Sequence, residues 1–126
     1  MYDKEIINAL YVRYSRHKHR KTLENLIKAC DPIVDVILAT RYRQHFRHHE
    51  DIKQEIRLRL WKNLGRRTKE SLRLERYVTN PTAYLFFLIR TYAARAFRRL
   101  KNVYKESIEI SYSHQMSKLS KDNDKD

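Results

Sequence analysis

The scarcity of glycine and proline is the feature that most limits what this chain can fold into. Its 126 residues include one glycine, Gly65, and two prolines, Pro32 and Pro81. Tight β-hairpin turns need residues that tolerate a positive φ, and glycine is the usual one, so a fold made of hairpins is difficult to build here. Apolar residues instead recur every three or four positions, which is the pattern of amphipathic helices. The sequence therefore predicts an all-α fold, a compact helical bundle with one modest core.

Local signals mark where several of these helices begin and end. Asp31-Pro32 and Asn80-Pro81 each place a capping side chain directly before a proline, which favours a helix start at both sites. Gly65 follows a periodic segment and is predicted to end it in the C′ position, with a positive φ. The predicted helices cover residues 6–14, 22–30, 32–38, 50–64 and 81–102, and a charged connector covers 66–79.

Composition divides the chain into three parts. Residues 1–21 hold the first helix and a basic segment, residues 22–102 form the main helical domain, and residues 103–126 form a polar tail. The tail is rich in Ser, Lys and Asp and is therefore predicted to be flexible and disordered.

The charge of the chain indicates a polyanionic partner. The sequence has 28 Lys and Arg against 15 Asp and Glu, a net charge of +13. Residues 103–126 carry four basic and five acidic side chains, so residues 1–102 carry 24 basic and 10 acidic ones. A basic helical protein whose full chain has nine tyrosines is typical of nucleic-acid binding, because aromatic rings stack on bases. On charge alone, a ribosome-associated or nonspecific nucleic-acid-binding protein fits equally well.

The last predicted helix has two distinct faces at 100° per residue. Its core face is apolar and comprises Leu85, Phe86, Ile89, Ala93, Ala96, Phe97 and Leu100. Its opposite face combines aromatic and basic residues and comprises Tyr84, Phe87, Leu88, Thr91, Arg95, Arg98 and Asn102. Such a face suits a single strand whose bases stack at one end and whose phosphates lie over the other. Alternatively, Tyr84 and Phe87 pack against the connector or the first helix.

The predicted helix over residues 50–64 also has two faces. Its core face comprises Ile52, Ile56, Leu60 and Leu64. Its second face comprises Asp51, Gln54, Glu55, Leu58 and Trp61. A tryptophan surrounded by leucine and carboxylates is typical of a protein-binding hot spot, with an apolar centre and a charged rim. The alternative is that Trp61 completes the core.

In this order, the two helices resemble region 2 of the bacterial sigma factor family. The run from Asp51 to Leu64, DIKQEIRLRLWKNL, is similar to the helix of that family that docks on RNA polymerase. The run from Pro81 to Arg90, PTAYLFFLIR, resembles the promoter-melting helix, especially in extracytoplasmic-function sigmas and T-even-type phage late sigmas. Leu26–Tyr42 is similar to the helix that precedes them. The resemblance covers about residues 22–102.

The resemblance implies a minimal transcription initiation factor. It implies that Asp51, Gln54, Glu55, Leu58 and Trp61 bind RNA polymerase core, at the clamp coiled coil of its largest subunit. It also implies that Tyr84 and Phe87 capture a base flipped from the non-template strand of promoter DNA. Thr91, Arg95 and Arg98 would lie on the neighbouring backbone or duplex edge, and Leu88 and Asn102 belong to the same DNA-binding face.

Two departures from the family pattern change these expectations. Housekeeping sigmas carry paired tryptophans where this chain has Phe87 and Leu88. Nothing after Asn102 resembles the second, helix-turn-helix DNA-reading domain, so the distal promoter contact is expected either to be absent or to be supplied by a separate subunit. A sigma-like polymerase inhibitor remains the alternative function, because an inhibitor shares the docking face and need not melt DNA.

Other functional classes have little support in the sequence. We expect no enzymatic activity and no cofactor. Cys30, the single cysteine, cannot form an internal disulfide or a cysteine-based zinc site. His45, His48 and His49 are dense, but their basic neighbours favour a basic loop over a metal site. The sequence has no membrane-length apolar run and no signal-peptide pattern, so a cytoplasmic protein is expected.

Overall fold

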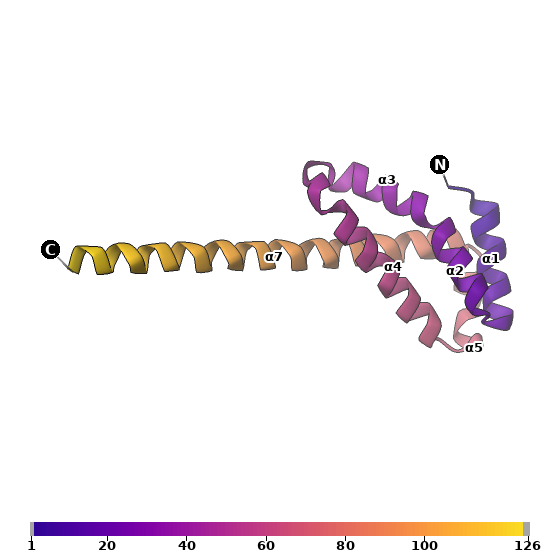
Figure 1. The fold of residues 1–126 in the computed structure, drawn as a ribbon. Coiled ribbons are helices and arrows are strands. Elements are labelled where there is room, and N and C mark those ends of the chain that lie inside the picture. Colours follow the sequence, from indigo (N-terminus) through magenta and orange to yellow (C-terminus); the bar gives the residue numbers. More distant parts are fainter. Residues whose placement is uncertain (1, 125–126) are drawn as a thin grey trace. The chain divides into compact units, whose positions relative to one another are not determined.

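The computed structural model describes the backbone of residues 2–124 and the side chains of residues 2–102 (Figure 1). Every element in this part of the chain is helical, which confirms the predicted all-α class. The chain divides into two compact units, Met1–Ala96 and Phe97–Asp126, and the last helix contributes to both. The elements are α1 (Lys4–His17), α2 (Arg20–Ala29), α3 (Asp31–Arg41), the 3₁₀ helix η1 (Arg43–His48), α4 (His49–Arg66), α5 (Lys69–Leu72), α6 (Glu75–Val78) and α7 (Pro81–Asp124).

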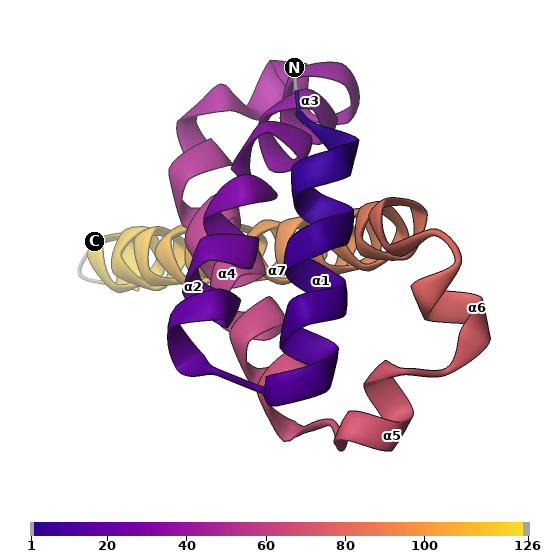
Figure 2. The same ribbon diagram turned by 90° about the vertical axis from the view of Figure 1, so that its right-hand side faces the viewer.

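The core of the first unit follows the predicted apolar stripes. Helices α1 and α2 lie side by side in opposite directions, and α4 packs against α2 and α3 (Figure 2). The predicted core residues of α4 are all buried, as are four of those of α7: Ile52, Ile56, Leu60, Leu64, Leu85, Ile89, Ala93 and Ala96. Tyr92, which the stripe did not include, is buried as well. Each large apolar side chain buried in this way contributes about 1.5–3 kcal/mol to folding.

Helix α4 ends differently from the prediction. Gly65 lies inside α4 and does not have a positive φ, so the expected glycine cap is wrong. The carbonyl groups left over at the helix end are satisfied by α1 instead. The Tyr14 hydroxyl donates to the Leu64 carbonyl (3.2 Å), and Lys18 Nζ donates to the Gly65 carbonyl (3.0 Å).

Helix α1 joins other parts of the first unit in the same way. Asn8 Oδ1 accepts a hydrogen bond from the Thr82 backbone N–H at the start of α7 (3.0 Å). The buried Tyr11 hydroxyl donates to the Leu72 carbonyl at the end of α5 (2.9 Å). Arg73 Nε in turn donates to the Ser15 carbonyl (3.1 Å), near the end of α1. Helix α1 is therefore tied by hydrogen bonds to the end of α5 and the start of α7.

The two Asx-Pro signals have different outcomes. At Asn80-Pro81 the prediction is confirmed, because Asn80 Oδ1 accepts a hydrogen bond from the Ala83 N–H (3.2 Å). Asp31 is not the N-cap of α3; that position belongs to Cys30, and Asp31 is the first helical residue. The Asp31 carboxylate accepts two hydrogen bonds from Arg57 on α4. The carboxylate is therefore engaged in a bidentate pair with a guanidinium and does not cap the backbone N–H groups of α3.

Two segments are more helical than predicted. The charged connector holds two short helices, α5 and α6, and the Thr68 hydroxyl caps the first by accepting from the Ser71 N–H (3.1 Å). Helix α7 was predicted to end near Asn102 and runs to Asp124. Polarity alone suggested the earlier end, and residues 82–124 contain no glycine or proline to stop a helix. The predicted polar tail lies outside the residues whose side chains are described.

Candidate functional site

A groove separates α2 from the outer face of α4. It has a volume of about 530 Å³ and includes three of the residues predicted to bind RNA polymerase, Gln54, Leu58 and Trp61. Leu58 is 52% exposed and Trp61 is half-buried, so Trp61 neither completes the core nor stands free in solvent. The groove is lined by Glu24, Ile27, Lys28, Asp31, Gln54, Arg57, Leu58 and Trp61.

Asp51 and Glu55 have different surroundings from these three residues. Asp51 is exposed and is not part of the groove wall. Glu55 Oε1 accepts a 3.3 Å contact from Arg59 Nη2 one turn along α4, and its side chain is 11% exposed. The carboxylate that the sequence assigned to a partner is therefore largely engaged within α4. An i, i+4 pair of Glu and Arg is readable from sequence and could have indicated this.

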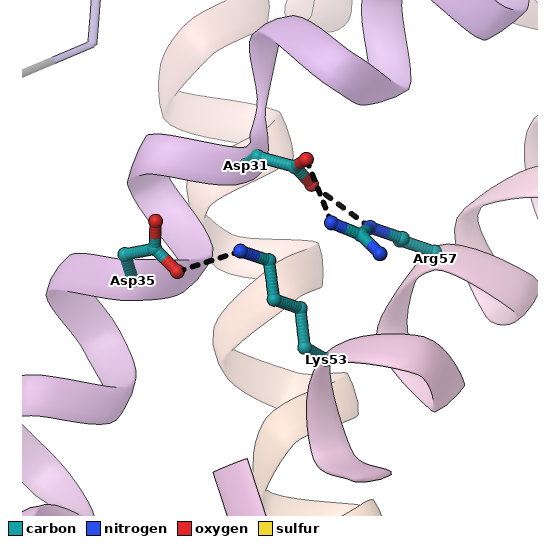
Figure 3. Close-up of polar contacts among 4 residues, drawn as sticks. All are labelled: Asp31, Asp35, Lys53 and Arg57. Atoms are coloured by element: carbon teal, nitrogen blue, oxygen red, sulfur yellow. Dashed lines mark hydrogen bonds and ion pairs between the residues drawn. The ribbon is translucent and has the colours of Figure 1, made fainter. Parts of the chain in front are cut away.

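Ion pairs with α3 neutralise the cations on the first turns of α4 (Figure 3). Arg57 Nη2 lies 2.8 Å from Asp31 Oδ2, and Lys53 Nζ lies 2.9 Å from Asp35 Oδ1. The hydrogen bond to Asp31 is the main reason why the pKa of Arg57 is raised above its ordinary value. In a strongly basic protein, the groove beside α4 is thereby left without an excess of free positive charge.

Helix α7 presents a different surface within the first unit. Phe87 is 59% exposed, and Arg90 and Arg95 are exposed as well. Arg90 and Arg95 make no ion pair with the part of the chain whose side chains are described. Thr91 donates its hydroxyl to the Phe87 carbonyl (2.9 Å), and Leu88 is half-buried. An exposed aromatic ring beside free guanidinium groups can contact both the bases and the phosphates of a strand.

Tyr84 does not share this exposed surface. It is half-buried, with its ring 4.2 Å from the Tyr77 ring of α6 and 6.4 Å from the Tyr11 ring of α1, centroid to centroid. Arg67 lies over the Tyr77 ring at 4.4 Å and donates a hydrogen bond to the Tyr84 hydroxyl. Burial raises the pKa of Tyr84, and Arg67 opposes that change. The expectation that Tyr84 and Phe87 lie together on the exposed face is wrong for Tyr84, which packs against the connector and α1.

The remaining predicted DNA-binding residues, Arg98 and Asn102, belong to the second unit. Both are exposed on α7. Their predicted role rests on the sequence pattern alone, because the two units are described separately.

Cys30 and the histidines near residue 49 are the residues that could have suggested catalysis or metal binding. Burial raises the pKa of the Cys30 thiol to about 12, so this thiol does not act as a nucleophile at neutral pH. His49 Nε2 lies 2.7 Å from the Tyr42 carbonyl oxygen. In the described part of the chain, no group of three or more His, Cys, Asp or Glu side chains could hold a metal ion. None of the helices within residues 2–124 has the length and apolar character needed to cross a membrane.

Models of known protein families, curated proteins and solved structures were each compared with the chain, and no match was found.

Proposed function

We propose that this chain is a minimal sigma-like subunit of the transcription machinery. In this proposal, the groove between α2 and α4 binds RNA polymerase core at the clamp coiled coil of its largest subunit. The exposed surface of α7 around Phe87, Arg90 and Arg95 contacts the non-template strand of promoter DNA. The protein carries out no covalent chemistry and supplies binding energy for strand opening.

One observation supports this assignment above the others: the cations that α4 directs toward α3 are paired with carboxylates, whereas the exposed arginines of α7 in the first unit are not. Lys53 and Arg57 are engaged by the two aspartates of α3, whereas Arg90 and Arg95 have no carboxylate partner among the described residues. A groove with an apolar centre and a rim of two acidic and two basic side chains suits a protein partner. An aromatic residue next to unpaired arginines suits a nucleic acid.

The docking half of the proposal is tested by measuring binding to bacterial RNA polymerase core. Trp61→Ala is expected to weaken binding by about 2 kcal/mol or more, as hot-spot truncations do. Leu58→Ala, on the same groove wall, should also weaken binding while leaving the melting temperature unchanged, because Leu58 is half exposed. The control is Phe46→Ala, which removes a 68% exposed aromatic side chain outside the groove. Equal binding by all three variants would contradict the docking assignment.

The position of Tyr84 favours one second candidate, a sigma-like polymerase inhibitor. With Tyr84 packed against Tyr11 and Tyr77, Phe87 is the one member of the predicted base-capturing pair that is exposed. Permanganate footprinting of thymines on a promoter template with core polymerase separates the two functions. New reactivity that disappears with Phe87→Ala supports an initiation factor. Tight polymerase binding with loss of basal opening supports an inhibitor.

A further inference from the structure

A second hollow lies beside Trp61 and has a different character from the groove. Its volume is about 520 Å³, within the range of small-molecule sites, which is about 300–1,000 Å³. Four of its eight lining residues are cationic, and none is acidic. The lining residues are Tyr14, Lys18, Arg20, Leu23, Trp61, Lys62, Gly65 and Arg66.

The cations around this hollow are weakly compensated. Arg20 has its guanidinium carbon 5.4 Å from the centre of the Trp61 ring, and its one acidic contact is a 3.7 Å pair with Glu24. The Arg20 side chain is 81% exposed, so this pair contributes little. Lys62 and Arg66 are exposed and have no carboxylate partner among residues 2–102. Several like charges around one concavity create a positive potential that attracts an anion.

Two hydrogen bonds to carbonyl groups at the end of α4 fix the base of the hollow. Lys18 Nζ donates to the Gly65 carbonyl, and the Tyr14 hydroxyl donates to the Leu64 carbonyl. Tyr14 and Leu23 are buried, so they form an ordered apolar floor below the cations. The site therefore combines a buried floor, an aromatic side wall and an exposed charged rim.

We propose that this hollow binds a compact polyphosphate, such as pyrophosphate or the phosphate chain of a nucleoside triphosphate. Its cations converge on one concavity from α2 and α4, which suits several phosphates on one small ligand. A nucleic-acid backbone needs cations spaced along a track, as on a groove-following surface. The phosphate group is common to a small polyphosphate and to a DNA backbone, so the test compares these two ligands. This proposal does not depend on RNA polymerase binding.

The chain provides a direct probe of the site, because Trp61 is its only tryptophan. Intrinsic fluorescence of the full-length protein is titrated with inorganic pyrophosphate at constant ionic strength. A saturable change with 1:1 stoichiometry by calorimetry is expected. Lys62→Ala combined with Arg66→Ala should weaken binding at least about ten-fold, because each lost charged hydrogen bond accounts for roughly a factor of ten.

A matched control removes the same two kinds of charge elsewhere. Arg43→Ala combined with Lys69→Ala changes one exposed arginine and one exposed lysine outside the hollow. This variant should bind pyrophosphate as the wild type does. Equal weakening by both double variants, or a fluorescence change that never saturates, would show general charge screening and overturn the proposal.

The second arm compares ligand sources with the same fluorescence signal. A nucleoside triphosphate should compete with pyrophosphate for the site, whereas a short DNA duplex at equal phosphate concentration should not. A Trp61 signal produced by DNA and not by pyrophosphate would overturn the assignment to a compact polyphosphate and place a DNA backbone in the hollow.

Discussion

The first half of α4 and the part of α7 in the first unit both carry cations, but those of α4 are paired with carboxylates and those of α7 are not. On α4, Lys53 and Arg57 are paired with Asp35 and Asp31 of α3. On α7, Arg90 and Arg95 are exposed and form no ion pair with the described residues. The contrast shows that the formal charge of +13 does not describe any one surface. Where the few carboxylates lie determines which cations remain available to a polyanion.

The largest expected effect compares two double variants that remove equal charge. Arg90→Ala with Arg95→Ala should make the log–log salt dependence of DNA binding shallower by up to about two units, at about 0.7–0.9 per phosphate contact. Lys53→Ala with Arg57→Ala should leave this slope unchanged, because paired cations do not reach phosphates. The measurement is fluorescence anisotropy of labelled DNA at a series of salt concentrations. Equal slopes for the two variants would mean that total charge, and not its placement, controls binding.

The next effect concerns the aromatic residues of α7. Phe87→Ala should cost about 1–3 kcal/mol in binding to single-stranded promoter DNA, because an exposed ring stacks on an unpaired base. Binding to the fully paired duplex should change much less. Tyr84→Phe keeps the buried ring and removes the hydroxyl that Arg67 contacts, so it should bind single strands as the wild type does. A larger loss with Tyr84→Phe than with Phe87→Ala would show that the Tyr84 cluster opens on binding.

Arg57→Ala on α4 is expected to lower the free energy of unfolding by about 1 kcal/mol more than Arg95→Ala on α7 does. Arg57→Ala breaks a bidentate pair and leaves Asp31, 26% exposed, without its partner. Arg95→Ala removes an exposed side chain that has no carboxylate partner among residues 2–102, and should change stability by less than about 0.5 kcal/mol. Urea unfolding followed by circular dichroism measures both. If Arg95→Ala were the more destabilising substitution, the α7 surface would be structural.

The smallest expected effect is a difference in stabilising energy between the two ion pairs shown in Figure 3. Lys53→Ala should cost only about 0.2–0.5 kcal/mol, because Asp35 is 60% exposed and remains hydrated after the pair is lost. A double-mutant cycle between positions 53 and 35 gives the coupling energy directly. A coupling larger than that between Arg57 and Asp31 would reverse the assigned ranking.

The sequence predicted what is periodic or local and missed what depends on distant partners. Ile52, Ile56 and Leu60 are buried as predicted, because a spacing of about one turn between successive residues places them on one face. Asn80 caps α7 because the signal lies within three residues. The pairing of Arg57 with Asp31 spans 26 positions and has no signature along the chain. Tyr84 could not be placed either, because helix periodicity places a residue relative to its own helix and not relative to α1 or α6.

The hydrogen bonds made by α1 have a consequence for how this protein folds as it is made. The first helix to be synthesised finds its partners at Leu64, Leu72 and Thr82, at sequence separations of 50, 61 and 74 residues. Long separations slow folding because the intervening chain must be closed into a loop first. We expect α1 and its neighbour α2 to associate early during translation, because they pack side by side, while the hydroxyls of Tyr11 and Tyr14 still lack their acceptors. A nascent chain stopped before Leu64 would therefore leave part of the α1 surface that the finished protein buries uncovered, and would be a natural substrate for chaperones.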